Sequence, residues 1–437
     1  MNISKTKKTA LFSFCFLLFF LSASSAVSLA VRADSASDAP VSPALSVLAE
    51  ENPMAMAGIV GNSILFEADD FARALNLSSV DTVTVTQTPP TTDGELRVGS
   101  TVVNRGHTIS SSDLSLLSYT ANSDVRTSSF RFRVGNAPYE LTCQLYLLDK
   151  LNYAPTLTHA PKTALEVSTH RNVTIFGTLP CYDPDGDQTI IEIVSYPENG
   201  ILILEDRTTG AYRFTPSDGY SGKDSFTYVA RDCYGNYSAA ATVSLHVVKP
   251  STSVLYTDLA DHPSHHAALT MTEKGIMSGT QIGTANYFYP GLSVSRAEFT
   301  VMAMQSLGIT DVTDSTPTVF ADNDDIPASM RGYVATAYEL GYVKGLYRDD
   351  TLCFEPNRSI TRAEAAVMLG NMIDAATPTV KPVFSDSDSV PSWAASSLAS
   401  LSSMGIIEAV DGNIAPTSEV TRADSAMILS KLISAME

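Results

Sequence analysis

The tetrapeptide Ser295-Arg296-Ala297-Glu298 recurs twice further along the chain, as Thr361-Arg362-Ala363-Glu364 and Thr421-Arg422-Ala423-Asp424. In each copy a hydroxyl residue is followed three residues later by an acid, which is the capping-box pattern of a helix start. The apolar residues that follow have helical spacing, which in the second copy falls on Ala365, Met368, Leu369 and Met372. We therefore expect Glu298, Glu364 and Asp424 to cap three helices that pack on a core.

The tetrapeptides belong to a longer repeat of about 60 to 66 residues. Each repeat opens on an aromatic residue and an aspartate two positions later, in Tyr256-Thr257-Asp258, Phe320-Ala321-Asp322 and Phe384-Ser385-Asp386. A proline stands six residues before each arginine, at Pro290, Pro356 and Pro416. We expect three repeats, at residues 254–310, 316–375 and 380–437.

The arginine of each tetrapeptide is not explained by helix capping. In the first turn, the positive end of the helix dipole disfavours a cation by some tenths of a kcal/mol. An anion bound there reverses that balance, because free amides and a guanidinium together form a site for a carboxylate or phosphate. A solvated arginine is the alternative, and the identical context of three copies favours the anion site.

The triplicate resembles the S-layer homology domain. That resemblance implies an all-α pseudo-trimer, with a three-helix-bundle core and three prongs. In the family, the matching arginine binds an acidic, often pyruvylated, secondary cell-wall polysaccharide attached to peptidoglycan, and the opening aspartate takes part. The polysaccharide-binding residues expected here are Arg296, Arg362, Arg422, Asp258, Asp322, Asp386, Ser295, Thr361, Thr421 and Trp393.

The three copies differ in detail. Trp393 stands where the family commonly has an aromatic residue, but Pro263 and Ser329 occupy the equivalent places. The indole either stacks on a sugar or packs in the core. The second copy is expected to be the most complete site. The alternative for the whole triplicate is a module that docks another surface protein.

The segment 152–248 contains short β-rich runs separated by Gly/Pro/Asp turns, at 172–176, 189–194, 201–205, 211–215, 225–230 and 241–248. This spacing indicates a β-sandwich. The phrases Asp183-Pro184-Asp185-Gly186-Asp187 and Asp224-Ser225-Phe226-Thr227-Tyr228 resemble bacterial cadherin-like, immunoglobulin-type repeats. The segment 54–150 is interpreted as a degenerate relative, with a short helix at 69–75 and a half-buried strand at 129–134. The predicted fold is thus multidomain.

Three carboxylates, Asp183, Asp185 and Asp187, alternate along one tight turn. Their oxygens suit a hard cation such as Ca²⁺, and the family resemblance suggests a calcium site that Asp232 completes. An EF-hand is excluded because Gln188 and Val194 replace the required glycine and acid. A metal-free turn is the alternative, since Asp, Pro and Gly favour turns for backbone reasons.

Cys181 and Cys233 flank this acidic cluster in the sequence. If Asp183 and Asp232 approach one cation, the two sulfurs lie close together, and an exported chain can form a disulfide there. Two free thiols are the alternative. Cys143 and Cys353 are expected to be buried singly.

The chain has 437 residues, 28 Lys+Arg against 47 Asp+Glu and a net charge of -19. This acidity argues against nucleic-acid binding, which needs clustered cations. Three lysines and an apolar run at 10–21 predict a signal peptide at 1–26, with cleavage possible up to residue 33. A linker is expected at 27–53. No later run approaches the length of a membrane span, so we expect an exported chain. The resemblance to the S-layer homology domain implies that it belongs to the cell wall or S-layer of a bacterium.

No common catalytic motif for hydrolysis or nucleotide binding is present. His262, His265 and His266 cluster, but Pro263 interrupts them and a helix start is expected there rather than a metal site. The sequence therefore predicts no enzyme and no required cofactor. It predicts a cell-surface anchor whose β modules act as a spacer or S-layer element. The alternative is an adhesin whose β modules bind an external glycan or protein.

Overall fold

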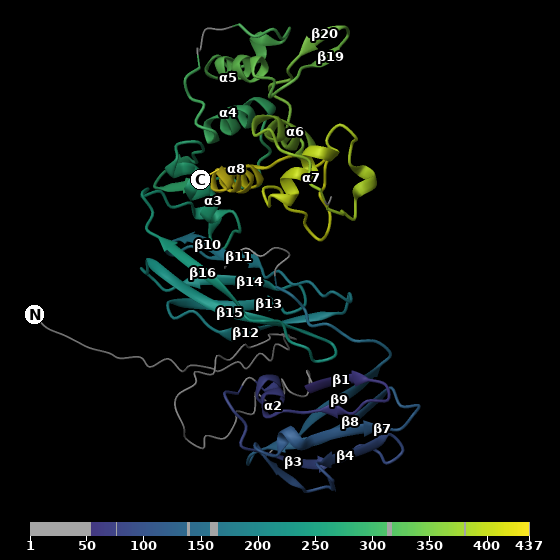
Figure 1. The fold of residues 1–437 in the computed structure, drawn as a ribbon. Coiled ribbons are helices and arrows are strands. Elements are labelled where there is room, and N and C mark those ends of the chain that lie inside the picture. The colour runs from purple at the N-terminus through teal and green to yellow at the C-terminus, as the bar shows by residue number, and fades with distance from the viewer. Residues whose placement is uncertain are drawn as a thin grey trace, which may run out of the picture. The chain divides into compact units, whose positions relative to one another are not determined.

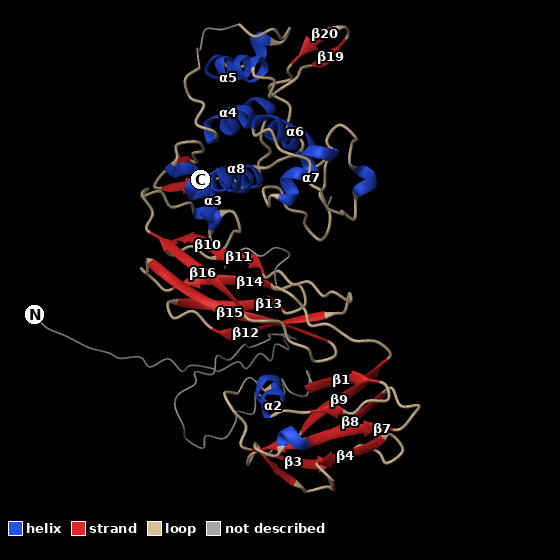
Figure 2. Ribbon diagram, viewed as in Figure 1, coloured by secondary structure: helices blue, strands red, loops and turns tan. Residues whose placement is uncertain are grey.

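The computed structural model describes residues 54–75, 77–137, 140–157, 165–312, 317–379 and 382–436, which belong to one compact unit. The predicted signal peptide at 1–26 and linker at 27–53 lie outside the described residues. Two β-rich modules come first along the chain and a helical region follows (Figure 1, Figure 2). No helix within the described ranges is long and apolar enough to cross a membrane.

The first module is a sandwich of two sheets. One sheet has the order β1 (Met54–Ile59), β9 (Leu141–Leu148), β8 (Thr127–Val134), β3 (Thr82–Gln87) and β6 (Thr108–Ser110). The other has the order β2 (Ile64–Leu65), β7 (Leu117–Ala121), β4 (Gly94–Val98) and β5 (Thr101–Val102). The predicted half-buried strand lies within β8, where Phe130 and Phe132 point into the core. The predicted short helix is α2 (Ala68–Ala74).

The second module repeats this plan. Its larger sheet has the order β10 (Leu165–His170), β16 (Ala241–Val248), β15 (Gly222–Asp232) and β12 (Thr189–Ser195). Its smaller sheet has the order β11 (Ile175–Thr178), β14 (Ala211–Pro216) and β13 (Gly200–Asp206). In both modules the first strand pairs in parallel with the last. The two modules therefore share one strand topology. The sequence did not predict β10, because only Leu165 and Val167 are apolar in it.

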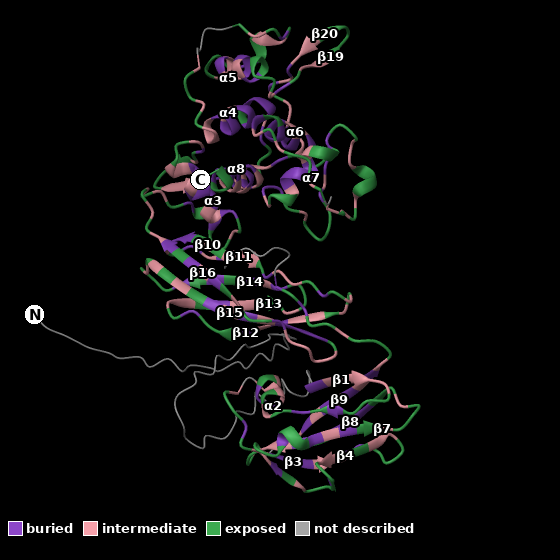
Figure 3. Cartoon of the chain, in the orientation of Figure 1, coloured by how far each residue is buried: buried purple, intermediate pink, exposed green. Residues whose placement is uncertain are grey.

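Each module buries its own core (Figure 3). In the second module, Phe214, Phe226 and Tyr228 are fully buried between the sheets. Alternation along β14 and β15 brings these rings to the inner face, as a period of two requires.

The helical region contains three repeats of similar construction. The first has α3 (His265–Glu273), β17 (Thr280–Ile282), β18 (Ala285–Tyr287) and α4 (Arg296–Ser306). The second has α5 (Ala328–Glu339), β19 (Leu346–Arg348), β20 (Thr351–Cys353) and α6 (Arg362–Met372). The third has α7 (Ala395–Ser403) and α8 (Arg422–Met436). The predicted multidomain fold with a helical repeat region is confirmed, and two short hairpins add β structure to the repeats.

The repeats close into a ring. The helix that ends each repeat packs on the first helix of the next, in the pairs α4 with α5, α6 with α7 and α8 with α3. A triangle of backbone hydrogen bonds joins the segments before these helices: Val294 N–H to Val420 O (2.9 Å), Ile360 N–H to Val294 O (3.1 Å) and Val420 N–H to Ile360 O (2.9 Å). These three residues are almost completely buried. The arginine-bearing helix starts therefore surround one approximate threefold axis.

Candidate functional site

All three tetrapeptides form the helix caps that their spacing predicts. Ser295 Oγ accepts the amide of Glu298 (3.3 Å), and Glu298 Oε2 accepts the amide of Ser295 (2.9 Å). The same exchange joins Thr361 with Glu364 and Thr421 with Asp424. The hydroxyl and acidic residues are thus engaged in structure at each helix start.

The first two amides of each of these helices bond to the next repeat. Arg296 N–H donates to Arg358 O (2.8 Å) and Ala297 N–H donates to Pro356 O (3.1 Å). The second and third copies repeat the pattern, with the acceptors Ser418, Pro416, Leu292 and Pro290. The expectation that free amides line an anion site therefore does not hold for these positions, because the neighbouring repeat supplies their acceptors.

The guanidinium groups of Arg362 and Arg422 also reach the next repeat. Arg362 donates from Nε to Ile414 O (2.9 Å) and from Nη2 to Glu408 O (2.9 Å). Arg422 donates from Nε to Phe288 O and from Nη2 to Ser278 O, both at 2.7 Å. Within the described part of the chain, the Nη1 amino group of each arginine has no hydrogen-bond partner. Each group thus keeps one donating edge for a ligand.

Arg296 is placed differently. It is only 7% exposed, donates from Nη2 to Lys344 O (2.9 Å), and holds Nη1 4.0 Å from Glu364 Oε1. Its Nε is buried without a partner among the described residues. Burial lowers the pKa of this guanidinium below its usual value. The junction between the first and second repeats is therefore closed around its arginine more tightly than the other two.

Sequence reasoning missed the carbonyl acceptors of these arginines. Ser278, Lys344 and Glu408 each stand three residues after the glycine in the middle of a repeat, at Gly275, Gly341 and Gly405. That constant spacing was the available signal. A backbone acceptor leaves no trace in residue type, so the spacing alone did not reveal its role.

The opening aspartates hold the same loops that the arginines reach. Asp258 accepts the amides of Phe288 (2.8 Å) and Tyr289 (2.7 Å). The corresponding pairs are Asp322 with Phe354 and Glu355, and Asp386 with Ile414 and Ala415. The second residue of each loop has a positive φ: 58° at Tyr289, 60° at Glu355 and 50° at Ala415. Backbone hydrogen bonds, from Ile414 first, lower the pKa of Asp386.

Arg362 and Arg422 thus bond to the loop that an opening aspartate holds. Arg296 instead lies over the ring of Phe354, with its Cζ 5.1 Å from the ring centroid, and Asp322 accepts the amide of Phe354. The arginine comes from one repeat, and the aspartate and loop come from the next. This juxtaposition places a cation and a carboxylate beside a backbone of fixed shape.

Trp393 lies just before α7 and is 59% exposed. The alternative that the only tryptophan packs in the core is therefore wrong. Its open ring face remains available for stacking on a sugar.

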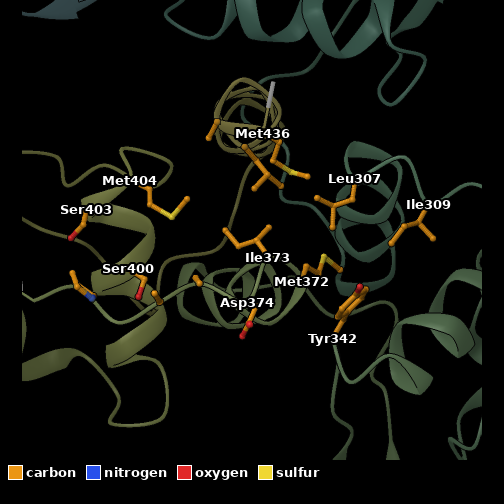
Figure 4. A pocket seen from close by; sticks show the side chains of 15 residues that line it. Leu307, Ile309, Tyr342, Met372, Ile373, Asp374, Ser400, Ser403, Met404 and Met436 are labelled. Carbon is orange, nitrogen blue, oxygen red and sulfur yellow. The ribbon is translucent and has the colours of Figure 1, made fainter. Parts of the chain in front are cut away.

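A hollow of about 700 Å³ lies at the opposite ends of the helices (Figure 4). Leu307, Met372 and Met436 line it, at or near the C-terminal ends of α4, α6 and α8. It is mostly apolar and has none of the arginines or opening aspartates in its lining. The candidate anion-binding edges therefore lie away from this hollow.

The structure brings Asp183, Asp185 and Asp187 together, with one carboxylate oxygen of each within 4.8 Å of the others. Asp183 is 7% exposed, and its Oδ1 accepts the amides of Asp185 (2.9 Å) and Asp187 (3.1 Å). Oδ2 of Asp183 and Oδ2 of Asp187 are buried without partners among the described residues. Burial, and then the charge of Asp183, raises the pKa of Asp187. This donor set fits a hard cation.

Asp232 is fully buried but is not one of the three converging carboxylates. Its Oδ1 accepts the amides of Tyr234 and Asn236, and its Oδ2 accepts the side-chain amide of Asn152 at 2.6 Å. Asp232 therefore fixes the turn beside the cluster.

The predicted disulfide is not formed, because Cys181 and Cys233 are both free thiols in this structure. Cys181 Sγ instead donates to Thr189 Oγ1 (3.5 Å), whereas Cys233 is exposed. Of the two cysteines expected to be buried singly, Cys143 is buried and Cys353 is half-buried.

Comparison with known families assigns two kinds of domain. Residues 152–246 match the bacterial Ig domain family. Residues 255–300, 320–366 and 383–426 match the S-layer homology domain family.

Relatives with known names share parts of the chain. An amylopullulanase of Thermoanaerobacterium thermosulfurigenes is 28% identical over 41% of this chain and 9% of its own length. A cellulosome-anchoring protein of Acetivibrio thermocellus is 32% identical over 28% of this chain and 27% of its own. An S-layer protein of Bacillus anthracis is 32% identical over 24% of this chain and 13% of its own. The chain thus spans about a quarter or less of each of these relatives.

Proposed function

Because the chain is a cell-surface protein with a bacterial Ig domain and three S-layer homology domains, we propose that its helical repeats anchor it noncovalently to an anionic secondary cell-wall polysaccharide. The cellulosome-anchoring and S-layer relatives are consistent with this role. The ligand proposed for each working junction is a sugar carboxylate, and the pyruvyl group is the chemistry that supplies one.

The observation that carries the proposal is the open edge of two guanidiniums. Arg362 and Arg422 are rigidly held through Nε and Nη2, and each presents Nη1 without a partner among the described residues. A pre-oriented guanidinium loses little freedom on binding, and its bond to a carboxylate is charge-assisted. We assign the two main sites to these arginines, with Asp386 and Asp258 fixing the loops beside them.

Competition tests the class of polymer. The full chain should pellet with purified cell walls, and soluble wall-polysaccharide fragments that carry pyruvyl groups should release it. The same fragments with the pyruvyl groups hydrolysed should be at least about tenfold weaker competitors, since one charge-assisted contact is worth about 1.5 to 3 kcal/mol. Equal competition by both preparations would contradict the pyruvyl assignment.

We propose that the β modules form a non-catalytic spacer that is displayed from this anchor. In the first module, the exposed large apolar side chains among the described residues, Leu65, Val102 and Leu116, include no aromatic ring that would present a sugar-stacking face. The second module does expose Tyr153, Tyr182 and Tyr196, so the alternative, an adhesin that binds an external glycan, would use that module. An assay of the full chain on wall and capsule polysaccharides should detect no released sugar. Turnover would overturn this part of the proposal.

We also propose that the Asp183, Asp185 and Asp187 cluster binds Ca²⁺. The buried, unpartnered oxygens of Asp183 and Asp187 support this assignment. At a hundred times its Kd, calcium stabilises the folded chain by about 2.7 kcal/mol. Millimolar calcium should therefore raise the sandwich's melting temperature by about 5 °C or more at pH 7.

The pH dependence of that shift follows from Asp187. Its raised pKa favours the protonated form in the folded chain without a cation, so carboxylate repulsion destabilises the module above that pKa and is relieved below it. The calcium shift should accordingly shrink as pH falls from 7 towards about 4. Calorimetry of Asp187→Asn should show a smaller shift, and Glu166→Gln, on the exposed side of β10, should retain the full one. An unchanged melting temperature of the natural chain in calcium would overturn the site.

A further inference from the structure

A series of three polar side chains, one buried and two half-buried, joins the sandwich to the first helical repeat. His170, at the end of β10, is 2% exposed. Its Nε2 lies 3.2 Å from Glu273 Oε2, and its Nδ1 lies 2.8 Å from His266 Nδ1. His266 and Glu273 belong to α3, which contacts β10. The sandwich residue Val173 adds an apolar contact, because it is buried within the core of the repeats.

The hydrogen-bond pattern limits how many protons His170, His266 and Glu273 can hold together. When His170 donates from Nε2 to the Glu273 carboxylate, its Nδ1 accepts from His266, and both imidazoles are neutral. One added proton can be held by His170 as an ion pair with Glu273, with His266 then accepting at Nδ1. A second proton creates two imidazolium rings whose centroids are 4.6 Å apart beside one carboxylate. In that state the described part of the chain offers no second carboxylate within bonding distance of the two rings.

We propose that His170, His266 and Glu273 form an acid-sensitive latch, which couples the sandwich module to the first repeat near neutral pH and releases it when both histidines are charged.

The surrounding groups support release in acid. Burial first, and then the charge of His170, lowers the pKa of His266 to about 4. Glu273 opposes this effect, and His265 adds to it. His265 is itself influenced by His170, Asp261 and His262, and burial lowers its pKa as well. The remaining contacts of Glu273 are to the backbone amides of Ser251 and Thr252. Among the described residues, Glu273 is the carboxylate that bonds to the histidine pair.

The sign of the pH effect follows from linkage. A histidine whose pKa is lowered in the docked state favours docking while it is neutral. That contribution is complete above its free pKa of about 6.5, and it is lost as pH falls towards about 4. One pH unit corresponds to up to a tenfold change in the docking equilibrium for one proton.

Hydrogen–deuterium exchange on the full chain tests the latch. Protection of peptides 165–173 and 262–275, relative to 127–134 in the first module, should fall at least about tenfold between pH 7 and pH 4. His266→Asn keeps a donor near the Nδ1 position but cannot titrate, so its protection should stay nearly constant. His246→Asn, at an exposed position on β16, should behave like the natural chain.

Glu273→Gln provides a second test that does not depend on the folding of His266→Asn. It removes the carboxylate that bonds to His170 and offsets the first proton, so release should begin at a higher pH than in the natural chain. Constant relative protection of the natural chain from pH 7 to pH 4 would overturn the latch. Acid release of His266→Asn identical to that of the natural chain would overturn it as well.

Discussion

Replacing Arg362 and Arg422 together by alanine should weaken binding of the full chain to purified cell walls by at least about a hundredfold. Each substitution removes an Nη1 edge that is pre-oriented for a carboxylate, and a hydrogen bond to a charged group is worth about 1.5 to 3 kcal/mol. The double variant also loses the gain in affinity that comes from attaching two sites to one polymer. A cosedimentation isotherm measures the change directly.

The controls for this experiment separate binding from folding. Both arginines also bond to backbone carbonyls, so thermal unfolding must show that the double variant is folded at the temperature of the assay. Arg97→Ala, on β4 of the first module, removes an exposed cation of the same kind. Arg296→Ala should have a smaller effect on binding, because Arg296 is buried beside Glu364. A folded double variant that pellets like the natural chain would contradict the assignment.

The second large effect is expected at the junction where the third repeat contacts the first and closes the ring. Arg422→Ala leaves the carbonyls of Phe288 and Ser278 without their donors, although Ser278 lies 144 residues earlier in the chain. Loss of such bonds costs about 2 to 3 kcal/mol. Amide exchange in residues 278–289 should therefore accelerate by about 30- to 150-fold, which hydrogen–deuterium exchange resolves by peptide.

A matched substitution shows whether the effect is specific to ring closure. Arg348→Ala removes an exposed arginine of the second repeat that pairs with Glu355. It should leave exchange in residues 278–289 unchanged. If Arg422→Ala accelerates exchange only within its own helix, repeats 3 and 1 are not coupled through this side chain.

The helical region could be predicted closely because its signals are local. A hydroxyl and an acid three residues apart satisfy amides of their own helix start, so spacing alone predicts the capping boxes at Ser295 and Thr361. The strands of the second module were predicted for a similar reason, since turn residues separate runs of β-forming residues. Strand β10 was missed because its outer positions are polar and its pairing partner, β16, is 78 residues away.

The roles of the arginines could not be predicted in the same way. Their acceptors are backbone carbonyls of another repeat, at Ser278, Lys344 and Glu408, and any residue type supplies such an acceptor. The backbone amides that we expected to bind an anion instead donate to carbonyls of the next repeat, and residue type does not reveal those acceptors either. The family resemblance grouped Asp232 with the acidic cluster, but its oxygens fix a turn instead.

The contact between the histidines could not be predicted from the sequence either. His265 and His266 marked a helix start in the sequence, as α3 confirms. The partner of His266 is His170, which lies 96 residues earlier in a strand that the sequence did not predict. A contact between modules depends on the tertiary fold, so the sequence around one histidine does not indicate that the other lies beside it.

The most direct test of the anchoring function is cosedimentation of the full chain with purified cell walls, before and after acid extraction of the secondary polysaccharide. The account predicts strong pelleting with intact walls and loss of pelleting with the extracted peptidoglycan. Equal pelleting with both preparations would contradict it, because the repeats would then bind peptidoglycan or a wall protein instead of the anionic polymer.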